Sequence, residues 1–470
     1  MASVESSPYS IAPGGEAIGE PVSPARPISR AARITALDCI RGFAVLGILL
    51  MNIVGMGVYG GAYIDPTIIG GDKGANLWMW VTMHIIADGK MRCLFSMIFG
   101  SSVVLLTSRL EGRQDAADIY YRRTLWLLVF GIVHAYLLWY GDILYAYALC
   151  GLLLYPFRNL RAKKLVIIGA VLVLLDSAMY VGTAFELRDT IRRGTAAEQI
   201  EAGGTKLSDE QQTAKAQYER WRKIMRPTAE ELAHDADQWR GNPLKVIAIR
   251  ASVVFNLFHN APYYSPDNFD IWSMMFLGMG LIKLDVLSGK RSRRFYLSLL
   301  VVGYGVGVPV NVYTAWMIVR NHFDPVAYGL SNAFLDPGRF LVAAGHLSVV
   351  MLVLKAGWFK PLMRGLGAAG QLALSNYILQ SVITAFLFTG YGFRFYDRMQ
   401  RFQLYYIVAG IWVIGLVWSS IWLRHFQFGP LEWCWRSLTY WKRQPMRLRT
   451  PDVISQAAAQ PLLTGTDGPC

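Results

Sequence analysis

Long apolar stretches with few charges dominate this sequence, and they constrain the fold more than any other feature. A helix needs about 20 apolar residues to cross the hydrocarbon core of a bilayer, which is roughly 30 Å thick. Ten such stretches are visible, at 36–58, 93–108, 121–140, 143–157, 164–184, 268–287, 295–318, 335–356, 371–391 and 403–425. We therefore expect an all-α, polytopic integral membrane protein with about ten transmembrane helices.

Composition supports a membrane protein and argues against the other broad classes. Apolar residues make up 54% of the chain and charged residues 17%, against roughly 25% charged residues in soluble domains. The formal net charge is +14, but its Lys and Arg residues gather in short loops on one side, which is typical of cytoplasmic loops. We therefore expect the lipid bilayer as a partner and no nucleic acid.

The distribution of basic residues predicts the orientation and the domain limits. Residues 1–33 are polar and rich in Pro, Gly and Ser, which predicts a disordered cytoplasmic tail. We expect one membrane domain at 34–441, a helical insert at 185–245 outside the cytoplasm, and a basic, disordered cytoplasmic tail at 442–470. Both termini are expected in the cytoplasm.

Two further apolar stretches lie between the predicted spans. The stretch 76–90 and the following span exceed the length of one crossing, and a polar break at Asp88-Gly89-Lys90 divides them. We expect a short outer helix that dips into the membrane, followed by a full span. The stretch 246–264 contains several polar residues, which favours an interfacial or re-entrant helix.

Polar side chains inside apolar spans are costly, so they are candidates for function. Asp38 and Arg41 share one helix face, either as an ion pair that anchors the helix end or as a substrate site in which Asp38 orients Arg41. Asn52 lies deep in the same span and needs a hydrogen-bond partner.

Two histidines are candidates for a general base. His84 and Asp88 are four residues apart, so a carboxylate would face the imidazole, although an interfacial histidine beside a helix-ending aspartate fits equally. His134 lies inside a predicted span. It is either a proton relay or base, or a residue that donates one hydrogen bond to a neighbouring helix. Asp142 follows in a tight turn, where it caps the next helix or lies near the outer mouth of a cavity.

Metal chemistry is not indicated, because the five cysteines form no CxxC pair and no Cys/His cluster has the spacing of metal ligands. We therefore expect no metal ion.

Several motifs in the same order resemble the YeiB-like bacterial membrane proteins, the family of domain of unknown function 418. The motifs are LDCIRGFAVLGILLMNI (37–53), FSMIFG (95–100), GIVHAYLLWYGDILYAYALCG (131–151), SNYILQS (375–381), GYGF (390–393) and FGPLEWCWRSLTYW (428–441). The resemblance covers roughly residues 34–441 and implies a protein of the bacterial inner membrane.

This family is similar to a broader superfamily of transmembrane acyltransferases, which includes lysosomal heparan-glucosaminide acetyltransferases and bacterial enzymes that modify surface glycans. The shared features are an LDxxRG-type first helix, here at 37–42, and a histidine upstream of an FxxxFG-like helix, here His84 before 95–100. The resemblance implies a catalytic role for His84, with His134 as its rival.

The expected activity is transfer of an acyl group from coenzyme A to a glycan or small-molecule acceptor outside the cytoplasm. Arg41, Arg122 and Arg123 are candidates for binding the donor phosphates, although ordinary cytoplasmic charge explains them equally. The runner-up is a small-molecule transporter that uses Asp38, Arg41 and His134. A third alternative is a non-catalytic partner in envelope assembly, and homo-oligomer formation stays open.

Overall fold

The computed structural model describes residues 35–260 and 266–448, and every regular element in these two ranges is helical. The predicted tail 1–33 and the last 22 residues of the chain lie outside the described part. The α-helices are α1 (Thr35–Gly57), α2 (Gly74–Ile86), α3 (Lys90–Arg109), α4 (Ala116–Leu137), α5 (Leu144–Leu152), α6 (Ala162–Ala202), α7 (Asp209–Met225), α8 (Ala229–Trp239), α9 (Pro243–Asn260), α10 (Pro266–Lys283), α11 (Arg293–Arg320), α12 (Pro325–Ala356), α13 (Lys360–Gln371), α14 (Ala373–Phe388), α15 (Arg401–His425) and α16 (Pro430–Thr439).

Within the described ranges, six segments are long and apolar enough to cross a bilayer: α1, the segment Gly74–Arg109 that comprises α2 and α3, α6, α11, α12 and α15. The pair α13–α14 is apolar enough only when taken together, and its 87° bend makes it either a broken span or a re-entrant loop. The prediction of an all-α, multi-pass membrane protein is therefore supported, whereas the predicted number of ten spans is not confirmed.

The segment predicted as a span at 143–157 differs from a single crossing helix. α5 has nine residues, which rise only about 14 Å and cover less than half of the hydrocarbon core. A 3₁₀ turn over Tyr155–Phe157 follows, with Pro156 in it. Proline lacks the backbone N–H that a continuing helix needs, so apolar composition alone overestimated the length of this helix.

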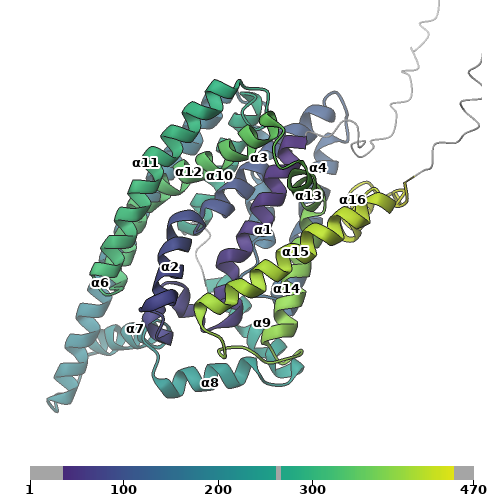
Figure 1. Ribbon diagram of the computed structural model, residues 1–470. Coiled ribbons are helices and arrows are strands. Elements are labelled where there is room, and N and C mark those ends of the chain that lie inside the picture. The colour runs from purple at the N-terminus through teal and green to yellow at the C-terminus, as the bar shows by residue number, and fades with distance from the viewer. Residues whose placement is uncertain (1–34, 261–265, 449–470) are drawn as a thin grey trace, which may run out of the picture.

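α1 occupies the centre of the bundle, with α13 crossing its beginning (Figure 1). Its buried residues lie all around the helix, which is typical of a helix enclosed by other helices. Gly42 faces the backbone of Leu366, and Gly370 faces the backbone of Asp38. Because neither position has a side chain, the two helices approach to backbone contact.

The break predicted at Asp88-Gly89-Lys90 is present between α2 and α3. Gly89 has a φ of 73°, a left-handed conformation that glycine adopts without strain. The side chain of Arg339, from α12, occupies the space where a Cβ atom of residue 89 would lie. The break therefore admits a charged side chain between two apolar helices.

The predicted helical insert at 185–245 contains the end of α6, then α7 and α8. Both short helices begin with a capping box, formed by Ser208 with Gln211 and by Thr228 with Glu231. α7 and α8 lie at the end of the bundle opposite to α13 and α16 (Figure 1). This arrangement agrees with a helical cap on one side of the membrane domain.

The described chain continues past the predicted domain limit at 441. The Gln427 backbone N–H donates to the Met446 carbonyl oxygen (2.9 Å), and Trp433 Nε1 donates to the Gln444 carbonyl oxygen (2.8 Å). Residues 442–448 thus fold back beside α16, so the beginning of the segment expected to be disordered is held by hydrogen bonds.

The crossing of α1 and α13 predicts a position-specific loss of stability. Gly370→Ala places a methyl group against the Asp38 carbonyl oxygen, so we expect destabilisation by about 1–3 kcal/mol. Gly410→Ala on α15 is the control, because no heavy atom lies within 4 Å of its Cβ position. Thermal unfolding of detergent-purified protein checks this, and equal midpoints for the two variants would contradict the close crossing.

Candidate functional site

A first cavity, the arginine cavity, opens between the beginning of α1, the end of α3, the beginning of α4, and α16. Its volume is about 470 Å³, within the usual range for a small-molecule site. Five arginines line it: Arg41, Arg109, Arg113, Arg123 and Arg436. The acidic residues that line it are Asp38 and Glu432, so its lining carries an excess of positive charge.

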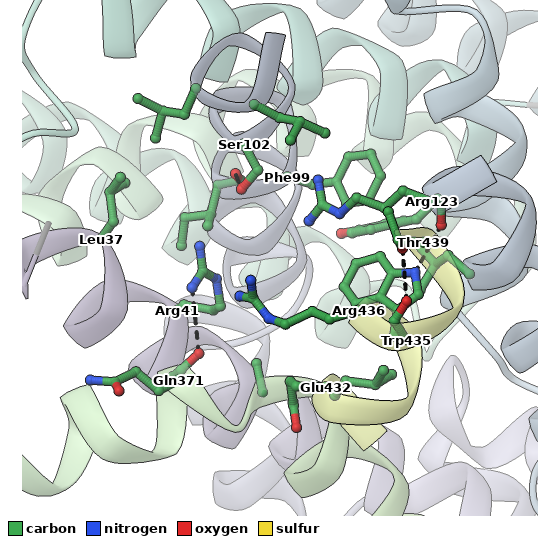
Figure 2. Close-up of a pocket in the computed structure, with 18 of the residues that line it drawn as sticks. Leu37, Arg41, Phe99, Ser102, Arg123, Gln371, Glu432, Trp435, Arg436 and Thr439 are labelled. Atoms are coloured by element: carbon green, nitrogen blue, oxygen red, sulfur yellow. Dashed lines mark hydrogen bonds between the residues drawn. The ribbon is translucent and has the colours of Figure 1, made fainter. Parts of the chain in front are cut away.

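Arg41 forms the predicted ion pair and also lines the arginine cavity. Its Nη1 atom donates to Asp38 Oδ1 (2.9 Å) and lies 3.5 Å from the Gly370 carbonyl oxygen, so the predicted ion pair on one face of α1 is present. Figure 2 shows Arg41 and Arg436 extending from α1 and α16 toward the same part of the cavity. Two guanidinium groups that converge in this way favour an anionic ligand.

Glu432 also lines the cavity, and its carboxylate is hydrogen-bonded to Ser375. It accepts hydrogen bonds from the backbone N–H and the hydroxyl group of Ser375, at 3.0 and 2.5 Å. Glu432 thereby ties α16 to the beginning of α14.

Arg122 and Arg123 are neighbours in sequence but differ in position. The Arg123 guanidinium lies over the Trp435 ring, 4.5 Å from its centroid, and lines the arginine cavity. Arg122 does not line the cavity; its Nη1 atom donates to the Thr439 carbonyl oxygen at the end of α16 (3.0 Å). Arg123 therefore remains a candidate ligand residue, and Arg122 anchors α16.

A second cavity, the tyrosine cavity, has a volume of about 600 Å³ and lies farther along α1. Its aromatic lining is Tyr63, Tyr140, Tyr145, Tyr180, Tyr328 and Phe258. Its polar lining is Asn52, Asp88, Arg92, Asp142, Asn332 and Arg339. Arg41 and Asn52 are separated by about 16 Å along the helix axis, so α1 connects the two cavities.

His134 and Asp142 lie at the partition between the cavities. His134 Nδ1 is 2.7 Å from Asp142 Oδ1, and its Nε2 is 2.8 Å from Ser381 Oγ, from α14. Asp142 lines the tyrosine cavity, while Tyr377, which lines the arginine cavity, donates from its hydroxyl group to Asp142 Oδ1 over 3.4 Å. A single hydrogen-bonded group thus reaches from one cavity to the other.

Asp142 also performs the capping role that the sequence left open. Its Oδ2 atom accepts a hydrogen bond of 2.6 Å from the Tyr145 backbone N–H, in the first turn of α5. With Oδ2 bound there, Oδ1 accepts from the imidazole. Because a carboxylate can only accept a hydrogen bond, His134 Nδ1 must carry the proton of the neutral ring. His134 Nε2 is then an acceptor and faces the Ser381 hydroxyl group.

His84 and Asp88 are also neighbours, as their spacing predicts, but they lie in a different setting. His84 Nδ1 is 3.7 Å from Asp88 Oδ2, and its Nε2 is 3.1 Å from Thr314 Oγ1. The His84 ring stacks on Trp80 and lines neither of the two cavities, whereas Asp88 lines the tyrosine cavity. Tyr63 donates to Asp88 Oδ1 (2.8 Å).

A network of buried charges beside the tyrosine cavity was missed at the sequence level. Arg339 Nη1 lies 2.6 Å from Asp336 Oδ1, and Arg339 Nη2 lies 3.6 Å from Asp88 Oδ2. Arg92 Nη2 lies 2.7 Å from Asp270 Oδ2. The signal was available, because Asp336 and Arg339 fall inside the predicted span 335–356 and charges inside spans are rare.

The described residues contain no group of three or more His, Cys, Asp or Glu side chains placed to hold a metal ion. The described part of the chain also offers a cavity lined by five arginines, a second cavity with aromatic and polar lining, and a histidine whose hydrogen-bond partners reach both linings.

Comparisons with known proteins place this architecture in a family. A family model described as "Protein of unknown function (DUF418)" matches residues 281–442. The chain is similar to the uncharacterized protein YxaH of Bacillus subtilis, with 28% identity over 89% of this chain and 97% of that protein. It is also similar to an uncharacterized 39.9 kDa protein of Bacillus acidopullulyticus, with 26% identity over 90% of this chain and 98% of that protein.

A third relative extends the likeness across nearly all of both chains. The uncharacterized protein YeiB of Escherichia coli is 30% identical over 87% of this chain and 96% of its own length. The chain therefore belongs to the YeiB-like family of membrane proteins that contain the DUF418 domain.

Proposed function

We propose that this protein transfers an acyl group from a coenzyme A thioester in the arginine cavity to a hydroxyl or amine acceptor in the tyrosine cavity. The observation that carries the proposal is the hydrogen-bonded group Tyr377–Asp142–His134, which reaches from the lining of one cavity to the lining of the other. The resemblance to transmembrane acyltransferases supports the same class of reaction.

The arginine cavity suits the donor because its lining combines guanidinium groups with apolar side chains. Coenzyme A carries several phosphate charges, which guanidinium groups bind with paired hydrogen bonds. Five arginines and several apolar side chains line the cavity, and Tyr377 in this lining has its ring centroid 4.9 Å from that of His134. The phosphates would therefore lie against the arginines, with the thioester directed toward Tyr377.

The tyrosine cavity suits an uncharged or weakly charged acceptor with several hydroxyl groups. Tyrosine rings provide flat apolar surfaces with polar edges, and asparagine and aspartate side chains bind hydroxyl groups. The positive-inside pattern predicts that the arginine cavity faces the cytoplasm of a bacterial inner membrane. The acceptor would then enter from the opposite side.

His134 acts as the general base in this proposal. The acceptor oxygen or nitrogen attacks the thioester carbon, the carbon–sulfur bond breaks, and the acceptor proton passes through Ser381 to His134 Nε2. The same proton then neutralises the departing coenzyme A thiolate. Asp142 holds the required tautomer and stabilises the imidazolium that forms.

His84 is the competing assignment, supported by the family resemblance and by its contact with Asp88. Neither histidine lines a cavity itself, but His134 reaches both linings through Asp142 and Tyr377, whereas His84 reaches only the lining of the tyrosine cavity, through Asp88. A different candidate function, transport of a small molecule, is favoured by the buried charges around Arg339, because such groups are typical of substrate and proton paths.

Binding of the donor tests the arginine cavity directly. We expect saturable binding of acetyl-coenzyme A to the detergent-purified protein, weakened about tenfold by Arg41→Ala, because one charge-assisted contact to a phosphate is lost. Isothermal titration calorimetry provides the measurement. Arg294→Ala, an exposed arginine that does not line the cavity, should bind as the wild type does. Equal losses in both variants, or no binding at millimolar donor, would contradict the proposal.

The base assignment is tested with water as the acceptor. Slow hydrolysis of acetyl-coenzyme A, followed by release of the coenzyme A thiol, should fall about 100-fold in His134→Ala. His346→Ala is the control, because His346 is also held by two hydrogen bonds, to Tyr304 Oη and the Ile86 carbonyl oxygen, but neither of these partners lines a cavity, whereas Asp142 does. A loss in His84→Ala with normal rates in His134→Ala would transfer the role to His84.

A further inference from the structure

A groove on the outside of the bundle, the α13 groove, is not used by the proposed acyl transfer. It lies between α13 and the ends of α12 and α15, with a volume of about 830 Å³. Its basic lining consists of Lys360, Arg364 and Arg424, and its lining contains no acidic residue among those that the structure describes. Apolar side chains, including Leu354, Met363 and Leu423, line the remainder.

The position of the groove relative to the predicted membrane follows from the helices that end there. α12 and α15 are both long and apolar enough to span a bilayer. Arg424 lies in the last turn of α15, and Lys360 opens α13 just after the end of α12. Charges at the ends of spanning helices lie at the depth of the lipid headgroups. The three cations are therefore placed at the headgroup level.

The shape of α13 supports this depth. α13 is bent by 87° from α14 and so does not continue in the direction of that helix. The second half of α13, Gly365–Gly370, is buried, and α13 packs against α1. In the first half, Pro361, Leu362 and Arg364 are exposed. Trp358 and Phe359, directly before it, are about two-thirds exposed, at 66% and 67%. Exposed aromatic rings beside basic residues are typical of a membrane interface.

The lining of the groove that the structure describes contains three cations and no carboxylate. Lys360 and Arg364 are four residues apart in α13, and Arg364 Nε lies 3.4 Å from the Lys360 carbonyl oxygen. Arg424 approaches from α15, and both arginines are exposed. Cations from two different helices therefore face one groove, which is the arrangement that binds a phosphate group.

We propose that the α13 groove binds one anionic phospholipid, with its headgroup phosphate between Lys360, Arg364 and Arg424. Its acyl chains would lie along the apolar surfaces of α12 and α15. This proposal is independent of acyl transfer, because it requires none of the residues around His134. It does connect to the arginine cavity in space, since Gln371 at the end of α13 lines both the groove and that cavity.

The test compares two lipids that differ in headgroup charge. Full-length protein in detergent is titrated with dioleoylphosphatidylglycerol or with dioleoylphosphatidylcholine, and thermal unfolding is followed by tryptophan fluorescence. A ligand that binds the folded state raises the midpoint in a saturable manner. We expect such a rise with phosphatidylglycerol and none with phosphatidylcholine. Inorganic phosphate at equal concentration should have no effect, because it lacks the apolar chains.

Three variants locate the site. Arg364→Gln and Arg424→Gln should each weaken binding of phosphatidylglycerol about tenfold, while Arg294→Gln, exposed near the start of α11 and outside the groove, should leave it unchanged. Arg364 is exposed on α13, so its variant keeps the test available if Arg424→Gln fails to fold.

Three results would overturn the proposal. Equal shifts with both lipids would show a general detergent-like effect, and a shift with inorganic phosphate alone would show a simple anion site. Unchanged binding in both arginine variants would show that the lipid binds elsewhere and that the groove is not its site.

Discussion

A polar group inside a bilayer has no water to bind, so each one must find its partner within the protein. This constraint shapes the centre of the bundle. Arg339 fills the break between α2 and α3 and contacts Asp88 and Asp336. Asp142 binds the His134 ring and accepts a hydrogen bond from the backbone in the first turn of α5. These contacts hold five helices around two cavities. Burying a polar group in an apolar bundle costs free energy, so these groups mark the positions where we expect a substrate to bind.

α1 connects these places because it is buried on all sides and runs past both cavities. Its beginning presents Arg41 to the arginine cavity, and Asn52 faces the tyrosine cavity. The crossing at Gly42 and Gly370 brings α13 against α1, so α13 forms a wall between the arginine cavity and the α13 groove. In our account, donor binding, acceptor binding and lipid binding are organised around this one pair of helices.

Much of the fold followed from local pattern, and less of the site did. Apolar length located the main helices, and the polar break at residues 88–90 was visible because glycine and charge interrupt an apolar run. Spacing of three or four residues correctly placed Asp38 beside Arg41 and Asp88 near His84. The contact between His134 and Ser381 joins residues 247 positions apart, and no local pattern encodes it. The shortness of α5 escaped detection because apolar composition does not show where a helix ends.

The proposed acyl transfer requires two cavities that open toward opposite sides of the membrane and approach each other at Tyr377 and Asp142. Cysteine accessibility tests it most directly, in a chain whose five native cysteines are replaced by alanine. Ser102→Cys lines the arginine cavity and Ala146→Cys lines the tyrosine cavity. With a membrane-impermeant thiol reagent, we expect Ala146→Cys to react in intact cells and Ser102→Cys to react only in inside-out vesicles. Reaction of both positions from the same side would contradict the account.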